Sequence, residues 1–163
     1  MEILLVVGII AILAGIVIVA INPARQIGAA RDSERKQMVD TINKAVSLFY
    51  IDKGYYPAST TDNSTALSGT SLEICDTGVN TFPASGVTCT SLLNLSELVP
   101  AYISAIPKDP SGGVGDTTYG TGYYMAKNTG NNMFIEARQS QLSDITIGST
   151  DGVTRNYTFS GSL

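Results

Sequence analysis

The chain has 163 residues, a formal net charge of −4, no histidine and no tryptophan. This length allows one ordinary domain and one appended element. The acidic balance argues against a general nucleic-acid binder, which needs clustered lysine and arginine, so no nucleic-acid partner is expected. Without histidine there is no Ser-His-Asp or Cys-His pair and no imidazole metal ligand. The sequence therefore predicts a protein that is not an enzyme and holds no cofactor.

The first feature along the chain is an unbroken apolar run from Ile3 to Ile21. As a helix this run would span about 28 Å, which is close to the bilayer core of about 30 Å. A cleaved secretory signal would begin with basic residues, whereas here Glu2 precedes the run and helical sequence follows it. The run therefore predicts a helix that lies in a membrane, and a simple membrane anchor is one reading of it.

Two features of this segment go beyond what an anchor requires. Glu2 places a carboxylate directly ahead of the run, where it would cost about 2.5–3.5 kcal/mol in lipid unless it were paired, so we expect a partner amine. Small residues also recur at Gly8, Ala11 and Gly15. Ala11 and Gly15 are four residues apart, a spacing that lets apolar helices approach closely. Ordinary membrane-helix composition is the alternative explanation of the small residues.

The segment MEILLVVGIIAILAG, from Met1 to Gly15, resembles the N-terminal helix of type IV pilins and pseudopilins. In that family a prepilin peptidase removes a basic leader, and the new N-terminal residue is methylated. A glutamate near the start then neutralises the terminal amine of a neighbouring subunit during assembly, and Glu2 matches that glutamate. The alignment implies a mature chain with three more residues ahead of Met1.

Pro23 predicts a kink or break of the helix between Val19 and Asn22, because proline lacks a backbone donor and clashes with the preceding turn. A new helix that starts with an Asn22 cap and an early proline is the other reading, and both can hold. By resemblance, the interval from Gly15 to Pro23 corresponds to the stretch that unwinds in pilin filaments.

A helical pattern resumes from Ala24 to Lys53, and Gly54 is predicted to end it. Its apolar residues recur at intervals of three and four, which makes one stripe for packing on a sheet. The stripe consists of Val39, Ile42, Val46 and Phe49. A charged section precedes the stripe and is expected to be a solvated face. Its members are Arg31, Asp32, Glu34, Arg35, Lys36 and Asp40.

The rest of the chain predicts a head built on an antiparallel sheet. Residues 58–86 read as surface loop, and Ser91–Ile103 reads as a short helix. Alternating patterns predict strands at Gly122–Lys127, Asn132–Arg138, Leu142–Ile147 and Val153–Ser160. The expected architecture is α+β, with an apolar helix over 1–23, an amphipathic stem helix over 24–54 and a head over 55–163. In the family that the N-terminus resembles, this is the type IV pilin fold.

Two pairs of residues in the head are candidates for special chemistry. Cys75 and Cys89 enclose a loop of about 15 residues, for which a disulfide is worth about 3 kcal/mol. The exported head that the resemblance implies favours the bridge, and free buried thiols are the alternative. Some pseudopilins bind calcium near a comparable segment, so Asp109 and Asp116 are candidate ligands. Since the spacing is not that of an EF-hand, turn-forming aspartates are the favoured reading.

The resemblance implies a major pilin, a structural subunit that polymerises with identical copies into an extracellular filament. Such a subunit resides in the cytoplasmic membrane before assembly and depends on the prepilin peptidase and the pilus assembly machinery. A major pseudopilin of a type II secretion-like system is one alternative, which the segment IPKDP from Ile106 to Pro110 favours. A monomeric membrane-anchored binding or adhesion module is the other.

Overall fold

The structure is a computed structural model that describes residues 2–20, 22–57, 71–75, 92–111, 120–128, 130 and 132–148. Its helices are α1 (Glu2–Ala20), α2 (Pro23–Lys53) and the short 3-10 helix η1 (Ser96–Leu98). Its strands are β1 (Leu72–Cys75), β2 (Gly120–Lys127), β3 (Met133–Ala137) and β4 (Ile145–Ile147). The strands form one antiparallel sheet in the order β1-β2-β3-β4. The chain is α+β, as predicted.

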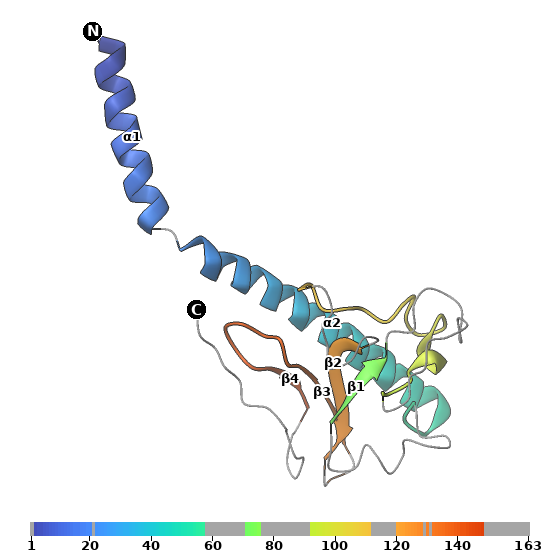
Figure 1. Ribbon diagram of the computed structural model, residues 1–163. Helices are drawn as coiled ribbons and strands as arrows, with labels where there is room; N and C mark the ends of the chain where they lie inside the picture. Colours follow the sequence, from blue (N-terminus) through green and yellow to red (C-terminus); the bar gives the residue numbers. More distant parts are fainter. Residues whose placement is uncertain are drawn as a thin grey trace.

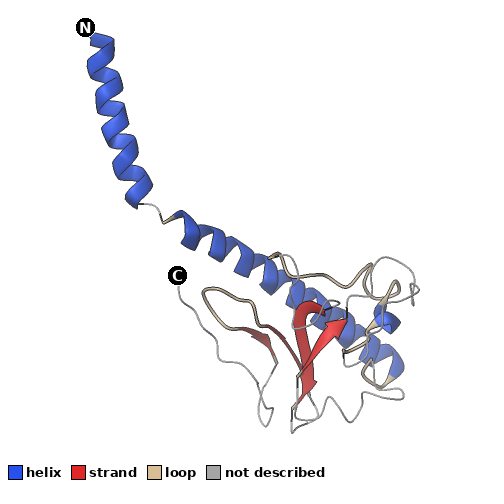
Figure 2. Ribbon diagram, viewed as in Figure 1, coloured by secondary structure: helices blue, strands red, loops and turns tan. Residues whose placement is uncertain are grey.

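The two long helices differ in their surroundings. Figure 1 shows α1 projecting away from the rest of the molecule, while α2 lies along the strands. The same view coloured by secondary structure shows a helical layer beside a strand layer, with α1 outside both (Figure 2). α1 and α2 are bent by 49° relative to each other. Of the two long helices, α2 is the one that packs against the strands.

The ends of α2 are fixed by local residues. Asn22 has extended backbone angles, and its side-chain oxygen accepts a hydrogen bond from the backbone N–H of Arg25 at 3.2 Å. Pro23 follows in the first turn, where its missing N–H costs nothing. At the other end Gly54 has a φ of 78° and donates its N–H to the carbonyl of Tyr50 at 2.8 Å. The predicted break at Pro23, the Asn22 cap and the Gly54 stop are all confirmed.

Three of the predicted strands correspond to β2, β3 and β4. β2 begins at Gly120 instead of Gly122, β3 lies within the predicted range, and β4 keeps only Ile145–Ile147. The turn between β2 and β3 is closed by the N–H of Asn128, which donates to the carbonyl of Asn132 at 2.9 Å. The fourth predicted strand, over residues 153–160, lies outside the described residues.

The prediction of continuous surface loop over residues 58–86 is wrong for β1. Leu72–Cys75 pairs with β2, and three of its four residues are buried. A strand of four residues is too short for its alternation to stand out from polar flanks. The pairing with β2 bridges more than forty residues of sequence, with Leu72 opposite Met125. The sequence near β1 therefore gives little indication that it forms a strand.

The prediction of a helix over Ser91–Ile103 is also wrong, since only η1 is helical there among residues 92–103. Leu93 instead forms a parallel bridge with Ile74. The N–H of Cys75 donates to the Leu93 carbonyl, and the N–H of Leu93 donates to the Glu73 carbonyl, each at 2.8 Å. The leucines at helical spacing are buried in the core by an irregular segment that runs beside β1.

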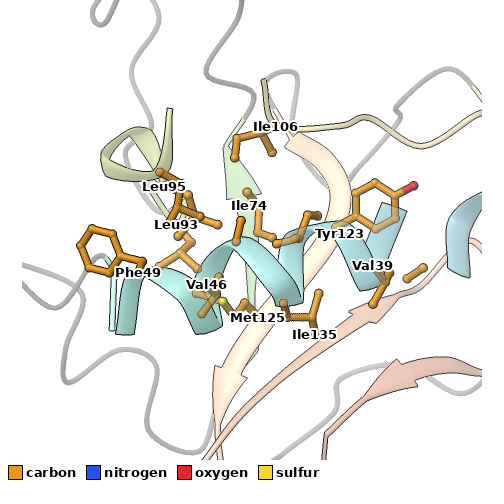
Figure 3. Close-up of a cluster of buried hydrophobic side chains, with 14 of the residues drawn as sticks. Val39, Val46, Phe49, Ile74, Leu93, Leu95, Ile106, Tyr123, Met125 and Ile135 are labelled. Carbon is orange, nitrogen blue, oxygen red and sulfur yellow. The ribbon is translucent and has the colours of Figure 1, made fainter. Parts of the chain in front are cut away.

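The core lies between α2 and one face of the sheet. The predicted stripe of Val39, Ile42, Val46 and Phe49 is buried there. Figure 3 shows side chains of the stripe beside those from the strands and from the segment before η1. The strand side chains in this cluster are Ile74, Tyr123, Met125, Ile135, Ala137 and Ile145. The stem stripe is confirmed as the helical half of the core.

A matched pair of isoleucines on α2 tests this packing. Ile42 is fully buried, whereas Ile51 is 79% exposed on the same helix. We expect Ile42→Ala to lower the free energy of unfolding by about 2–5 kcal/mol, because it leaves a cavity in the core. Ile51→Ala should change it by less than about 0.5 kcal/mol. Urea unfolding of the full chain in mild detergent measures both, and equal losses would contradict the packing.

Candidate functional site

α1 carries most of the exposed large apolar side chains in the described part of the chain. Every side chain described in it, from Glu2 to Ile18, is exposed. Its large apolar side chains are between 48% and 79% exposed. An apolar surface of this extent on one element marks a contact with a membrane or with another protein. The surface is the first candidate site of the molecule.

The small residues predicted for close helix contact lie on this exposed helix. Gly8, Ala11 and Gly15 are all exposed. A Cβ added at Gly8 or at Gly15 would meet no atom within 4 Å. No other part of the described structure packs against these positions, and they are open to contact with another helix. Pro23 lies at the other end of the surface, where α2 begins.

Glu2 lies in the first turn of α1 and is exposed. A carboxylate in this position interacts favourably with the partial positive charge at a helix N-terminus. It is the only charged residue of α1. The structure thus places one acid at the tip of an otherwise apolar rod.

The length of the apolar surface bears on membrane insertion. Within the described ranges, no single helix is by itself both long and apolar enough to qualify as a membrane span. α1 and α2 do meet that criterion as a bent pair, on length and composition alone. The assignment of residues 1–23 to a membrane-spanning helix stays a prediction.

The second candidate site is a buried ionic cluster around Arg35, which is fully buried. Its guanidinium donates to both carboxylate oxygens of Asp109, from Nε at 2.6 Å and from Nη2 at 3.0 Å. Nη1 donates to Asp32 at 2.6 Å, and Nη2 also donates to the hydroxyl of Ser111. The expectation that this charged section is a solvated face is wrong for Asp32 and Arg35. Their spacing continues the apolar stripe at Val39, which is the signal in the sequence that identifies them as inward-facing.

Asp32 extends the cluster to the connection between β3 and β4. Its carboxylate accepts hydrogen bonds from the backbone N–H of Gln141 at 2.9 Å and of Leu142 at 2.7 Å. These residues are more than one hundred positions away in the sequence. The cluster therefore joins α2 to two connections of the sheet, one before β2 and one after β3.

Asp109 is held close to β2. Its N–H donates to the carbonyl of Thr121 at 2.9 Å, and its carboxylate accepts the N–H of Ser111 at 2.8 Å. Gly122 has a φ of 83°, and a Cβ there would lie 2.9 Å from the Cβ of Asp109. Asp109 therefore makes the turn-forming contact that was predicted for it. Both of its carboxylate oxygens also accept hydrogen bonds from Arg35.

The other candidate calcium ligand, Asp116, lies outside the described residues. In the described part of the chain no three His, Cys, Asp or Glu residues gather as they would around a metal ion. Cys75 is disulfide-bonded, and Cys89 likewise lies outside the described residues.

A polar row crosses the opposite face of the sheet. Tyr124 is paired with Glu73 on one side and with Glu136 on the other, and all three are buried. The guanidinium carbon of Arg138 lies 3.6 Å from the Tyr124 ring centroid, and its Nε donates to Glu136 at 3.3 Å. A Cβ at Gly120 would lie 1.9 Å from the Glu73 carboxylate. This row depends on strand register, which the sequence alone does not give.

Aromatic side chains surround the far end of α2. Phe49 makes edge-on contacts with Tyr55 and Tyr102, at centroid distances of 5.5 and 5.3 Å. Tyr50 stacks on Tyr56 at 4.4 Å. These contacts fasten the end of the helix to the segment that follows it and to the connection before β2. Structural anchoring accounts for them.

Comparison with known protein families, with curated proteins and with solved structures finds no match to this chain. Its function is therefore inferred from the two sites themselves. The ionic cluster is internal and fully engaged, whereas α1 is exposed along all of its described side chains.

The cluster predicts an acid-sensitive contribution to stability. Burial opposes ionisation of Asp32, but the N–H groups of Gln141 and Leu142 together with Arg35 outweigh it and lower the pKa below its ordinary value of 3.8. A lowered pKa stabilises the fold above the unfolded value, and this stabilisation is lost as the pH falls through the folded value. At neutral pH we expect Asp32→Asn to cost about 3 kcal/mol. The difference from wild type should shrink below pH 3.8.

Urea unfolding between neutral pH and strongly acidic pH measures this difference. Asp40→Asn is the matched control, because Asp40 pairs with Lys44 on the surface and should contribute less than about 1 kcal/mol. A loss that stays constant with pH would contradict the role of the ionised carboxylate.

Tyr123 makes a separate prediction. Its buried hydroxyl has no hydrogen-bond partner among the described residues. Burial, with the nearby charge of Asp109, raises its pKa. Because a buried unsatisfied hydroxyl is costly, Tyr123→Phe should stabilise the head by about 1 kcal/mol. Thermal unfolding measures the change, with Tyr50→Phe on the surface as the control; a destabilised Tyr123→Phe variant would show that the hydroxyl is bonded.

Proposed function

We propose that the chain is a major pilin, the structural subunit of a type IV pilus-like filament at the cell surface. The observation that carries the proposal is α1, a rod of 19 residues in which Glu2 is the only charge and every described side chain is exposed. In a filament of identical copies, each α1 helix packs against the α1 helices of neighbouring subunits. No catalytic step and no cofactor are part of this function.

The rod needs an apolar environment at every stage. At about 1.5 Å per residue α1 is about 28 Å long, near the thickness of a bilayer core. In lipid the rods gain no hydrophobic drive toward each other, so close packing at small residues decides whether they associate. Gly8, Ala11 and Gly15 supply such positions, and a Cβ at either glycine has open space around it. The subunit would thus reside in the cytoplasmic membrane first and enter the filament core afterwards.

Glu2 sets the axial register between the α1 helices of neighbouring subunits. A carboxylate within an apolar bundle is costly unless it is paired, and the resemblance supplies the partner as the terminal amine of a neighbouring subunit. One acid on each rod then favours one axial offset over all others. The same resemblance makes the prepilin peptidase and the pilus assembly machinery partners of this chain, with a methylated mature N-terminus.

The arrangement of the head supports the pilin-specific fold as part of the proposal. A stem helix packs on a four-stranded antiparallel sheet, and Cys75 is in a disulfide, as suits an exported domain. The break before Pro23 lies at the end of the interval that, by resemblance, unwinds in filaments.

A major pseudopilin is the second candidate, favoured by the segment from Ile106 to Pro110. Here Asp109 of that segment binds Arg35, which gives the motif a structural role in either kind of subunit. A monomeric anchored module is the third. Electron microscopy of cells separates the pilin from the other two candidates, since only a pilin forms long surface filaments.

The assembly role of Glu2 predicts a separation between folding and polymerisation. We expect Glu2→Ala to leave the head folded, because Glu2 lies on the projecting helix, and to abolish efficient filament formation. Filament yield from sheared cells measures assembly, and protease resistance of the head measures folding. Glu34→Ala removes an exposed acid from α2 and should give wild-type yield. Normal filament yield from Glu2→Ala would refute the role.

A further inference from the structure

The first turns of α2 carry an exposed surface that the proposed function does not explain. Arg25, Ile27 and Arg31 are all exposed there, and Ile27 is 55% exposed. We call these three residues the basic collar. The collar begins two residues after Pro23, where the apolar rod has just ended. It combines two cations and one large apolar side chain on the same short stretch.

Within the described ranges neither Arg25 nor Arg31 forms an ion pair, and the nearest exposed acid on α2 is Glu34, three residues beyond Arg31. Asp32 is the one acid between Pro23 and Ser33, and it is buried against Arg35. The internal ion pair therefore removes one acid and one base from the surface together. What remains exposed over this stretch is the double positive charge of Arg25 and Arg31.

The bend between the helices sets the height of these charges. Arg25 and Arg31 lie two and eight residues beyond Pro23, which is about 3 and 12 Å along α2. A bend of 49° reduces these distances to about 2 and 8 Å along the direction of α1. The headgroup layer of one leaflet is about 5–7 Å thick, and an arginine side chain can reach back toward it. With α1 across the bilayer core, both guanidinium groups reach the phosphates.

We propose that the basic collar binds the phosphates of anionic phospholipids in the leaflet next to the head. The inference rests on the membrane stage of the proposed function. Each contact is a charge-assisted hydrogen bond from a guanidinium to a phosphate oxygen. These contacts fix the depth of the unassembled subunit in the membrane. They must break before the subunit enters the filament.

The overall charge of the chain opposes binding to an anionic membrane. The whole chain has a net charge of −4, so an anionic membrane would repel it unless a local cationic surface faced the lipid. Lysines at the far end of α2 lie too distant to matter. Lys44 is 21 residues beyond Pro23 and thus about 20 Å from the bilayer along α1, about two Debye lengths at 0.1 M salt. A preference for anionic lipid would therefore identify the collar.

The test uses the full chain, distributed at equilibrium between vesicles of pure phosphatidylcholine and vesicles that contain phosphatidylglycerol. Each basic residue at an anionic surface is worth about fivefold in partitioning, so we expect the anionic vesicles to be preferred by up to about thirtyfold at low salt. The preference should largely disappear at about 0.5 M salt. Arg25→Gln with Arg31→Gln should abolish it, whereas Lys44→Gln with Lys53→Gln, an equal loss of exposed charge, should preserve it.

The outcomes distinguish this inference from the function on which it rests. Equal partitioning of the wild type between the two lipids overturns the inference and leaves membrane residence intact. A preference that survives loss of both collar arginines overturns it as well. Failure to enter either kind of vesicle removes the membrane stage itself. If the double arginine variant has normal lipid preference and forms no filaments, the collar binds neighbouring subunits instead.

Discussion

The fold depends on the burial of one cation, Arg35, between two carboxylates. Removing a guanidinium from water is costly, and the cost is offset only when its donors are matched by well-placed acceptors. Asp32 and Asp109 supply that match from α2 itself and from the connection before β2. Asp32 in turn holds the connection after β3. An apolar core tolerates small slips of a helix over a sheet, whereas these directional bonds do not, so the cluster fixes where the stem lies.

The same burial decides the character of the outer surface. Sequence alone presents a mixed charged section after the apolar rod. The fold withdraws Asp32 and Arg35 as a neutral pair and leaves Arg25 and Arg31 outside. Burial of this pair leaves the local net charge unchanged, and the exposed positive charge of the first turns of α2 comes from Arg25 and Arg31, in a chain that is acidic as a whole. In the proposed function, Arg25 and Arg31 face lipid before assembly and neighbouring subunits after it.

Much of the fold could be predicted because its signals are local. The spacing of Val39 and Ile42, the Asn22 cap and the Gly54 stop each depend on a few neighbouring residues, and all are confirmed. β1 and the bridge at Leu93 escaped prediction because distant pairing creates them. The burial of Arg35 was not predicted, because its charged section was expected to face solvent. Its spacing from Val39 nevertheless places it on the buried stripe. The candidate site on α1 was predictable from composition, while the inner partners of Asp109 required the tertiary structure.

The way α2 lies along the sheet has a mechanical consequence. A pull on the rod reaches the head through the short joint at Asn22 and is then spread over the contacts between α2 and the sheet. Those contacts run from Asp32 to Phe49, so a load directed along the stem acts on them in shear, all at once. A load directed across the stem would separate them one after another. In the proposed filament, a subunit under tension is therefore most resistant along its own length.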